Sequence, residues 1–403
     1  MRAMLFDLNR FLIGLSYAID CVESELLGVT TNHGKRVAYI SLRLAQAAGL
    51  DDAERFDIAA CAILHDNGLA QENLSRPDLQ QNRLRQVEDM PDHCDIGEAN
   101  VSCFPFRSPA RDIIKFHHEH WNGAGFFGMR GDAIPLMAQI IGLADFVDLK
   151  FRFENPDPGN RERIQAFVQE KRGSAFSPDL AALFEEVSQS TGFWLDLRNH
   201  NIQQALSRRT PHHAVEMPWS QVLEVCRAFS RIIDSKSRFT LRHSSGLEEK
   251  NGVMATHYGM SADDTLMLRT AAALHDVGKL SIPNAILDKP GKLTDLERAR
   301  VQEHTYYTRQ CLEPIPGFEV ITEWAANHHE KLTGDGYPLR LPATALDFNA
   351  RLMTVLDIYQ ALTEDRPYRE GLTHTVTMEI IDRLTKSGEL EPQIVEDVRR
   401  VMA

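Results

Sequence analysis

The sequence lacks the features of a secreted or membrane protein. Its six cysteines are scattered, no pair has C-x-x-C spacing and no signal peptide precedes them. A disulfide framework is therefore excluded, and we expect reduced thiols that are mostly core or incidental. The most apolar N-terminal stretch, residues 11–22, is interrupted by Asp20 and is too short to span a bilayer. These absences predict a cytoplasmic protein with no membrane partner.

Positive charge and β-strand patterning are also scarce. A net charge of −13 and a pI near 5.7 argue against general binding to DNA or a membrane surface, because a polyanion normally selects a basic surface. No sustained apolar–polar alternation occurs between turn residues. Apolar residues recur instead at helical intervals over residues 8–26 and 222–232. The predicted fold class is all-α.

One pattern of histidines and aspartates occurs twice, about 210 residues apart. The first copy consists of His33, His65, Asp66, His93, His117, His118 and Asp145. The second copy consists of His243, His275, Asp276, His304, His328, His329 and Asp357. The main intervals are 32, 28, 24 and 27 residues in the first copy and 32, 29, 24 and 28 in the second. Such a pattern does not recur by chance, so we predict two tandem domains, 1–210 and 211–403, divided where two prolines break the helical pattern.

These residue types predict a metal centre in each copy. Adjacent helical residues point about 100° apart, so His275 and Asp276 cannot chelate one ion as an i, i+4 pair does, but the carboxylate can bridge two ions. Five further ligands suit two divalent transition-metal ions with open positions for water and substrate. Imidazole and oxygen ligands without thiolate favour Mn or Fe over Zn, Ni or Mg. Two such ions generate a bridging hydroxide and clamp a phosphoryl group.

The motifs around the second copy resemble the HD-GYP family, the bacterial phosphodiesterases that hydrolyse cyclic dinucleotides. HDVGK at 275–279, HHEKLTGDGYP at 328–338 and LTEDRPYR at 362–369 carry the resemblance, which covers the chain from about residue 234. It implies tandem HD-superfamily helical bundles with a di- or trinuclear centre. It also implies cleavage of a 3'-5' phosphodiester, in cyclic di-GMP or cyclic GMP-AMP, to the linear dinucleotide or onward to the mononucleotide.

The resemblance also assigns roles to single residues of the second copy. Asp276 bridges the two metals, one held with His243, His275 and Asp357, the other with His304, His328 and His329. Lys279 matches a lysine placed to contact the scissile phosphate and, with Asp276, is a predicted catalytic residue. The predicted substrate-binding residues are Tyr337, Arg366 and Arg369, although a structural salt bridge explains the two arginines equally well.

Three positions of the second copy depart from the family pattern. Thr333 replaces an aspartate, with an acid at Asp335 instead, and Gly246 replaces an arginine. Phe239 stands where some members have a glutamate ligand of a third metal. We therefore predict two metals rather than three.

The first copy keeps the seven ligand positions but loses their surroundings. Leu69 replaces the lysine, Gly125-Phe126-Phe127 replaces GYP, and no DRPYR counterpart follows Phe151. We therefore predict a regulatory or dimerising domain that binds up to two further metal ions without turnover. Arg36, which stands where the second copy has Gly246, argues against treating this domain as fully inert.

Two other functional classes stay open at this stage. The protein could be a sensor scaffold that binds metal or nucleotide without turnover, although Lys279 and the intact GYP argue against it. The first domain could house a di-iron redox or oxygen sensor, since it lacks phosphate-directed cations. The predicted partner is a cyclic dinucleotide substrate, with a homodimer and signalling proteins as further candidates.

Overall fold

The structure is a computed structural model that describes residues 3–27, 31–75, 90–151, 158–237, 243–289, 291–365 and 370–403. It divides into two compact units. The N-terminal unit comprises residues 7–214, and the C-terminal unit comprises residues 215–403 together with residues 1–6. The first six residues, which the predicted domain 1–210 includes, thus group with the second half of the chain.

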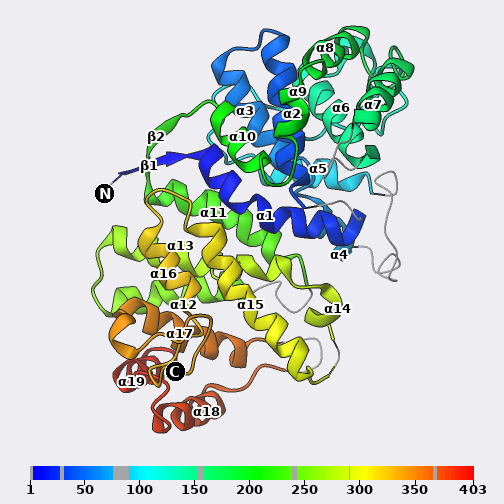
Figure 1. Cartoon of the computed structure of the whole chain (residues 1–403). Coiled ribbons are helices and arrows are strands. Elements are labelled where there is room, and N and C mark those ends of the chain that lie inside the picture. Colours follow the sequence, from blue (N-terminus) through cyan, green and yellow to red (C-terminus); the bar gives the residue numbers. More distant parts are fainter. Residues whose placement is uncertain are drawn as a thin grey trace. The chain divides into compact units, whose positions relative to one another are not determined.

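Helices form nearly all the regular structure of the described residues, which confirms the predicted all-α class (Figure 1). The sequence analysis missed one small sheet, in which β1 (Ala3–Asp7) pairs with β2 (Ala214–Pro218). Each strand has only five residues, too few for alternation to stand out. The predicted break at residues 210–220 therefore contains a strand.

The N-terminal unit is a bundle of helices of very different lengths. Its elements are α1 (Leu8–Leu27), α2 (His33–Ala47), α3 (Asp52–Ile63), α4 (Leu69–Ser75), α5 (Asp92–Asn100), η3 (Gly131–Ala133), α6 (Leu136–Phe151), α7 (Pro158–Glu170), α8 (Pro178–Ser188), α9 (Thr191–Asp196) and α10 (Ile202–Arg209). α1 matches the predicted opening helix, and its apolar stripe is buried. α7 begins at Pro158, within a stretch whose two prolines and glycine favour a loop.

The C-terminal unit repeats the order of ligand-bearing elements. Its helices are α11 (Trp219–Asp234), α12 (His243–His257), α13 (Ala262–Leu274), η4 (Val277–Ser281), α14 (Asn284–Leu287), α15 (Asp295–Leu312), α16 (Glu319–Ala326), η5 (Ala343–Ala345), α17 (Phe348–Thr363), α18 (His374–Lys386) and α19 (Pro392–Val401). α11 matches the second predicted opening helix.

Local sequence signals explain where the ligand-bearing helices begin. Asp51 and Glu54 form a capping box at α3, and Thr294 and Glu297 form one at α15. Asp347 caps α17 by accepting from the backbone N–H of Ala350. These caps set the register of three helices that lead to or carry metal-ligand candidates.

No helix among the described residues is both long enough and apolar enough to cross a membrane.

Candidate metal centres

Each His-Asp pair lies just beyond the end of a helix. His275 follows α13 and Asp276 precedes η4, so the pair is not inside one helix as the sequence reasoning assumed. Gly278 explains the tight turn, since a Cβ there would lie 1.9 Å from the carbonyl oxygen of His304. Gly68 makes the same approach to His93, at 2.2 Å. The glycine after each pair thus lets the turn pack against the helix that carries the next histidine.

Asp276 faces two groups of imidazoles in the C-terminal unit. Its Oδ2 lies 3.2 Å from His275 Nε2 and 3.7 Å from His243 Nε2. Its Oδ1 lies 3.4 Å from His304 Nε2 and 3.9 Å from His328 Nε2. The two oxygens of one buried carboxylate therefore face different histidines, and the bridging role of Asp276 stays a prediction.

Asp357, on α17, completes the C-terminal centre. Its Oδ1 lies 3.0 Å from His243 Nε2, and its Oδ2 lies 3.9 Å from His329 Nδ1. The Nε2 atoms of His304 and His328 are 3.3 Å apart. All seven predicted ligands of the second copy therefore converge, although their assignment to individual ions stays a prediction.

Backbone carbonyls orient several of these histidines. The Nδ1–H groups of His275, His304 and His328 donate to the carbonyl oxygen three residues earlier, at 2.6–2.7 Å. A carbonyl only accepts, so Nδ1 carries the proton and the Nε2 lone pair faces the centre. The Nδ1 of His243 lies instead 3.1 Å from the Glu364 carboxylate. The sequence analysis did not single out Glu364, although it lies within the LTEDRPYR motif.

The electrostatics of the site favour neutral imidazoles at His304 and His329 and an ionised carboxylate at Asp276. Burial, helped by the charge of Lys279, lowers the pKa of His304 to about 3. Burial also lowers the pKa of His329 to about 4. Burial opposes ionisation of Asp276, but His275 and Lys279 outweigh it and hold its pKa well below the usual range. Neutral His304 and His329 and an ionised Asp276 are the protonation states that a metal ion requires of its ligands. His243 differs, because burial lowers its pKa but Asp357 and Glu364 outweigh that effect and raise the pKa to about 9.

The residues fit a metal ion. The buried atoms His275 Nε2 and Asp276 Oδ1 have no hydrogen-bond partner. A buried polar group without a partner costs about 1–3 kcal/mol, and an ion bound at each of these atoms would remove that cost. Clusters such as His243, His275 and Asp276, with ligand atoms within 4.8 Å of one another, have the composition and spacing that metal ligation needs.

Lys279 and Tyr337 lie at the same centre. The Lys279 ammonium donates to Asp276 Oδ2 at 2.5 Å, and its side chain is 20% exposed. The Tyr337 ring lies against His329, with centroids 4.8 Å apart. Burial raises the pKa of the Tyr337 phenol, as do Asp357 and Asp276, so the phenol keeps its proton. Arg366 and Arg369 lie outside the described residues, as does Phe239.

Glu330 secures the loop that carries the GYP element. Its carboxylate accepts hydrogen bonds from the backbone N–H of Leu339 and of Leu341, at 2.7 and 3.0 Å. Gly336 allows the loop to approach, since a Cβ there would lie 2.5 Å from Glu330 Cα. The side chain is 1% exposed. Glu330, which the sequence showed only as part of a motif, thus links two candidate histidine ligands to the Tyr337 loop.

The N-terminal unit repeats the geometry of the centre. Asp66 Oδ1 lies 3.2 Å from His93 Nε2 and 3.6 Å from His117 Nε2, whereas Oδ2 lies 3.6 Å from His65 Nε2. Asp145 Oδ1 lies 3.2 Å from His33 Nε2, and its Oδ2 lies 4.0 Å from His118 Nδ1. All seven predicted positions of the first copy therefore converge as well. Buried His33 Nε2, His65 Nε2 and both oxygens of Asp66 have no hydrogen-bond partner.

The residues around the N-terminal centre differ from those around the C-terminal centre, as expected from the sequence. Leu69 is fully buried where the other unit has Lys279. Phe126 faces the His118 ring, with centroids 5.3 Å apart, and offers no polar atom in place of the tyrosine hydroxyl. A pocket beside this centre reaches His118 and Asp145 and is walled by Trp121, Phe146 and Phe176.

Arg36, the reason given for not treating the first domain as fully inert, is held inside the fold. It is fully buried, and its Nε and Nη2 donate to the two oxygens of Asp148 at 2.6 and 2.9 Å. Asp148 in turn accepts from His33 Nδ1 at 2.6 Å. Arg36 thus orients a metal-ligand candidate through a carboxylate.

The sequence analysis also missed Cys94. This cysteine follows His93 on α5, and its Sγ lies 3.5 Å from His93 Nε2. The side chains that could hold an ion in the N-terminal unit therefore include a thiol as well as nitrogen and oxygen donors. Its position next to a predicted ligand was the signal available in the sequence.

The family model described as HD domain matches residues 19–180 and 227–394. The chain belongs to the HD-domain family. The 3'3'-cGAMP-specific phosphodiesterase 1 of Vibrio cholerae is 31% identical over 96% of this chain and 92% of its own length. A cyclic di-GMP phosphodiesterase of Pseudomonas aeruginosa is 37% identical over 31% of this chain and 30% of its own. These relatives confirm the predicted resemblance to the HD-GYP phosphodiesterases.

A solved structure supports the fold independently. A cyclic GMP-AMP-specific phosphodiesterase of V. cholerae superposes with a TM-score of 0.71 at 24% identity, over 99% of this chain and 98% of that one. The HD fold therefore extends over nearly the whole chain. The predicted metal centre is confirmed in its general form, because the fold brings together His and Asp clusters that could hold a metal ion.

Proposed function

We propose that the protein is a metal-dependent phosphodiesterase that hydrolyses a cyclic dinucleotide, and that domain 211–403 carries the reaction. The observation that carries the proposal is the position of Asp276. Its two oxygens face two imidazole groups while Lys279 donates to the same carboxylate. A two-ion phosphoryl-transfer site needs a bridging carboxylate and a nearby cation in this relation.

Residues of the C-terminal unit have different roles in the proposed reaction. When bound, two divalent ions polarise phosphoryl oxygens and lower the pKa of water. The residues that would hold them are His243, His275, Asp276, His304, His328, His329 and Asp357. Lys279 supplies positive charge where charge develops on the phosphoryl oxygens. Water attacks phosphorus, the bond to the 3' oxygen breaks, that oxygen takes up a proton, and a linear dinucleotide results.

The preferred substrate is 3',3'-cyclic GMP-AMP. The relative that aligns with 96% of this chain is specific for that nucleotide, whereas the cyclic di-GMP phosphodiesterase aligns with only 31%. Cyclic di-GMP is the second candidate, because that shorter alignment is the more identical of the two, at 37%. Tyr337 is a substrate-binding residue in this proposal, and so are Arg366 and Arg369.

The metals of the C-terminal centre are two Mn or Fe ions. Its described ligand candidates offer only nitrogen and oxygen, which favours these ions over Zn, Ni or Mg. The N-terminal unit holds up to two further ions without turnover, because Leu69 replaces the lysine. Domain 1–210 is then regulatory. The cytoplasmic location, the homodimer and the signalling partners stay predictions.

Hydrolysis by the purified full-length protein tests the proposal. The protein is loaded with Mn²⁺ or Fe²⁺ and given cyclic GMP-AMP, cyclic di-GMP, a linear dinucleotide or a simple phosphodiester. We expect metal-dependent opening of the cyclic dinucleotides, faster for cyclic GMP-AMP, and none by Asp276→Asn. Tight nucleotide binding by metal-loaded protein without turnover would instead establish a sensor scaffold.

A further inference from the structure

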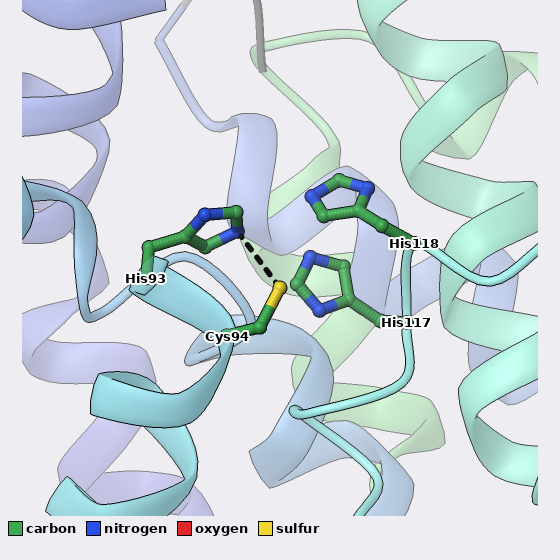
Figure 2. A group of neighbouring side chains, drawn as sticks. All are labelled: His93, Cys94, His117 and His118. Carbon is green, nitrogen blue, oxygen red and sulfur yellow. Dashed lines mark hydrogen bonds between the residues drawn. The ribbon is translucent and has the colours of Figure 1, made fainter. Parts of the chain in front are cut away.

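A thiol belongs to one half of the N-terminal centre. His93, Cys94, His117 and His118 offer one ligand atom each, and these atoms all lie within 4.8 Å of one another. Figure 2 shows the Cys94 sulfur between the His93 and His117 rings, with the His118 ring turned toward the same space. Among the described metal-ligand clusters, this one alone contains a cysteine.

The C-terminal unit has no sulfur at the matching position. There the corresponding cluster is His304, His328 and His329, and Thr305 follows His304 as Cys94 follows His93. The Thr305 hydroxyl is buried and donates to the carbonyl oxygen of Gln302 at 3.0 Å. The two centres therefore differ in ligand chemistry as well as in Lys279.

The imidazoles around Cys94 are oriented for ligation. His93 Nδ1 donates to the carbonyl of Met90, and His117 Nδ1 donates to the carbonyl of Ile114 at 2.6 Å. Their Nε2 lone pairs therefore face inward. The Nε2 atoms of His117 and His118 are buried without a hydrogen-bond partner, and Cys94 is fully buried. The Nε2 atoms of His117 and His118 thus lie beside a thiol without a hydrogen-bond partner.

The separation between the Cys94 sulfur and the His93 imidazole fits tetrahedral coordination. Metal–sulfur and metal–nitrogen bonds of about 2.3 and 2.0–2.1 Å at a tetrahedral angle place sulfur and nitrogen about 3.5–3.6 Å apart. Cys94 Sγ and His93 Nε2 are 3.5 Å apart. A thiol hydrogen bond to the imidazole gives a similar distance, so the experiment must separate the two arrangements.

We propose that His93, Cys94, His117 and His118 form a thiolate-containing site for a thiophilic divalent ion of the zinc class. The inference rests on the proposed metal binding by the N-terminal unit and adds the ligand and the class of metal. Four protein ligands fill a tetrahedral ion and leave no position for a reacting water, as in structural sites. When the ion binds, the Cys94 proton leaves to solvent and a metal–sulfur bond forms. The two units then bind different metals.

Cobalt spectroscopy of the full-length protein tests the thiolate ligand. A tetrahedral Co²⁺–thiolate bond gives charge-transfer absorption in the near ultraviolet. We expect this band in the Co²⁺-loaded wild type and in Cys61→Ser, which removes another buried thiol of the same unit. We expect Cys94→Thr, which installs the residue of the matching C-terminal position, to lack it. A band that survives Cys94→Thr, or disappears in Cys61→Ser, would overturn the proposal.

Metal content separates this inference from the proposals on which it rests. If Asp66→Ala loses metal relative to the wild type but no charge-transfer band exists, the unit binds metal without Cys94. If Asp66→Ala loses none, metal binding by the N-terminal unit fails too. Hydrolysis of cyclic dinucleotide, measured in the same samples, reports the C-terminal centre separately.

Alkylation of the wild-type protein tests the proposal if Cys94→Thr does not fold. In mild urea, bound Zn²⁺ should protect Cys94 from alkylation more than it protects Cys61. Equal labelling of the two cysteines would overturn the proposal.

Discussion

The two units differ most clearly in the positions of their positively charged side chains. Lys279 pairs with the Asp276 carboxylate of one centre, and a buried leucine, Leu69, takes its place in the other. The first copy has Arg36 where the second copy has Gly246, and this arginine is buried against Asp148. The sequence showed these exchanges, but it did not show that Arg36 is buried against Asp148, because these two residues are 112 positions apart in the chain.

Lys279→Ala should reduce hydrolysis without removing metal. If the ammonium stabilises charge on the phosphoryl group in the transition state, the loss in kcat/KM should be roughly 3–4 kcal/mol, a factor of about 10²–10³. Steady-state kinetics and elemental analysis measure the two effects. Lys292→Ala, at an exposed position, serves as the control. Loss of metal together with activity would show that Lys279 supports Asp276 and not the chemistry.

Arg36→Ala should destabilise the N-terminal unit. It leaves the buried Asp148 carboxylate without its bidentate partner, a change that costs about 3–5 kcal/mol. Urea unfolding followed by circular dichroism measures the free energy of unfolding. Arg43→Ala, which removes a half-buried arginine that donates to Tyr39 at 3.0 Å, should cost about 1 kcal/mol. Equal stability of Arg36→Ala and the wild type would contradict the structural role.

Helices, turns and loops differ in how far the sequence revealed them. Apolar spacing predicted α1 and α11, because each presents one continuous stripe to the core. The β1–β2 pair depends on residues about 210 positions apart, and α7 begins within a stretch rich in breakers. The two sets of candidate ligands followed from the repeat, whereas the hydrogen bonds of Glu330 and the position of Cys94 beside His117 and His118 became visible only in the structure.

Glu330→Gln should loosen the GYP loop and slow hydrolysis. The carboxylate accepts two backbone N–H bonds, and a neutral amide replaces it poorly, so we expect a loss of about 2 kcal/mol, roughly 30-fold in kcat/KM. Glu119 makes the matching bonds to Phe127 and Met129 in the other unit, at 2.7 and 2.6 Å. Glu119→Gln should therefore leave hydrolysis nearly unchanged. Similar losses in both variants would show that the effect is not local to the GYP loop.

At the scale of the whole molecule, a duplicated fold carries two centres with the same scaffold and different chemistry. Seven ligand positions converge in each unit, yet a cation and a tyrosine accompany one set, and a leucine, a phenylalanine and a thiol accompany the other. A buried His and Asp cluster without an ion leaves unsatisfied polar groups in a helical bundle. Retention of all seven positions in a unit without Lys279 therefore favours metal binding for regulation.

Variants of the full-length chain should separate the two centres. Residues 1–6 group with the C-terminal unit, so a fragment that begins near residue 212 would lack part of that unit. His275→Ala or Asp276→Ala should abolish hydrolysis, because each removes a ligand of the bridged pair. His65→Ala or Asp66→Ala should leave a substantial part of the rate.

Metal content and association state complete the test of the two centres. Elemental analysis should fall from about four ions per chain to about two when either pair is removed. Loss of the N-terminal ions should also change the remaining rate or the oligomeric state, read by kinetics and by light scattering. An equal loss of hydrolysis from both pairs would contradict the division of labour. An unchanged metal content, rate and association state after His65→Ala would leave the first repeat as a packing module, because its buried ligands would then serve no ion.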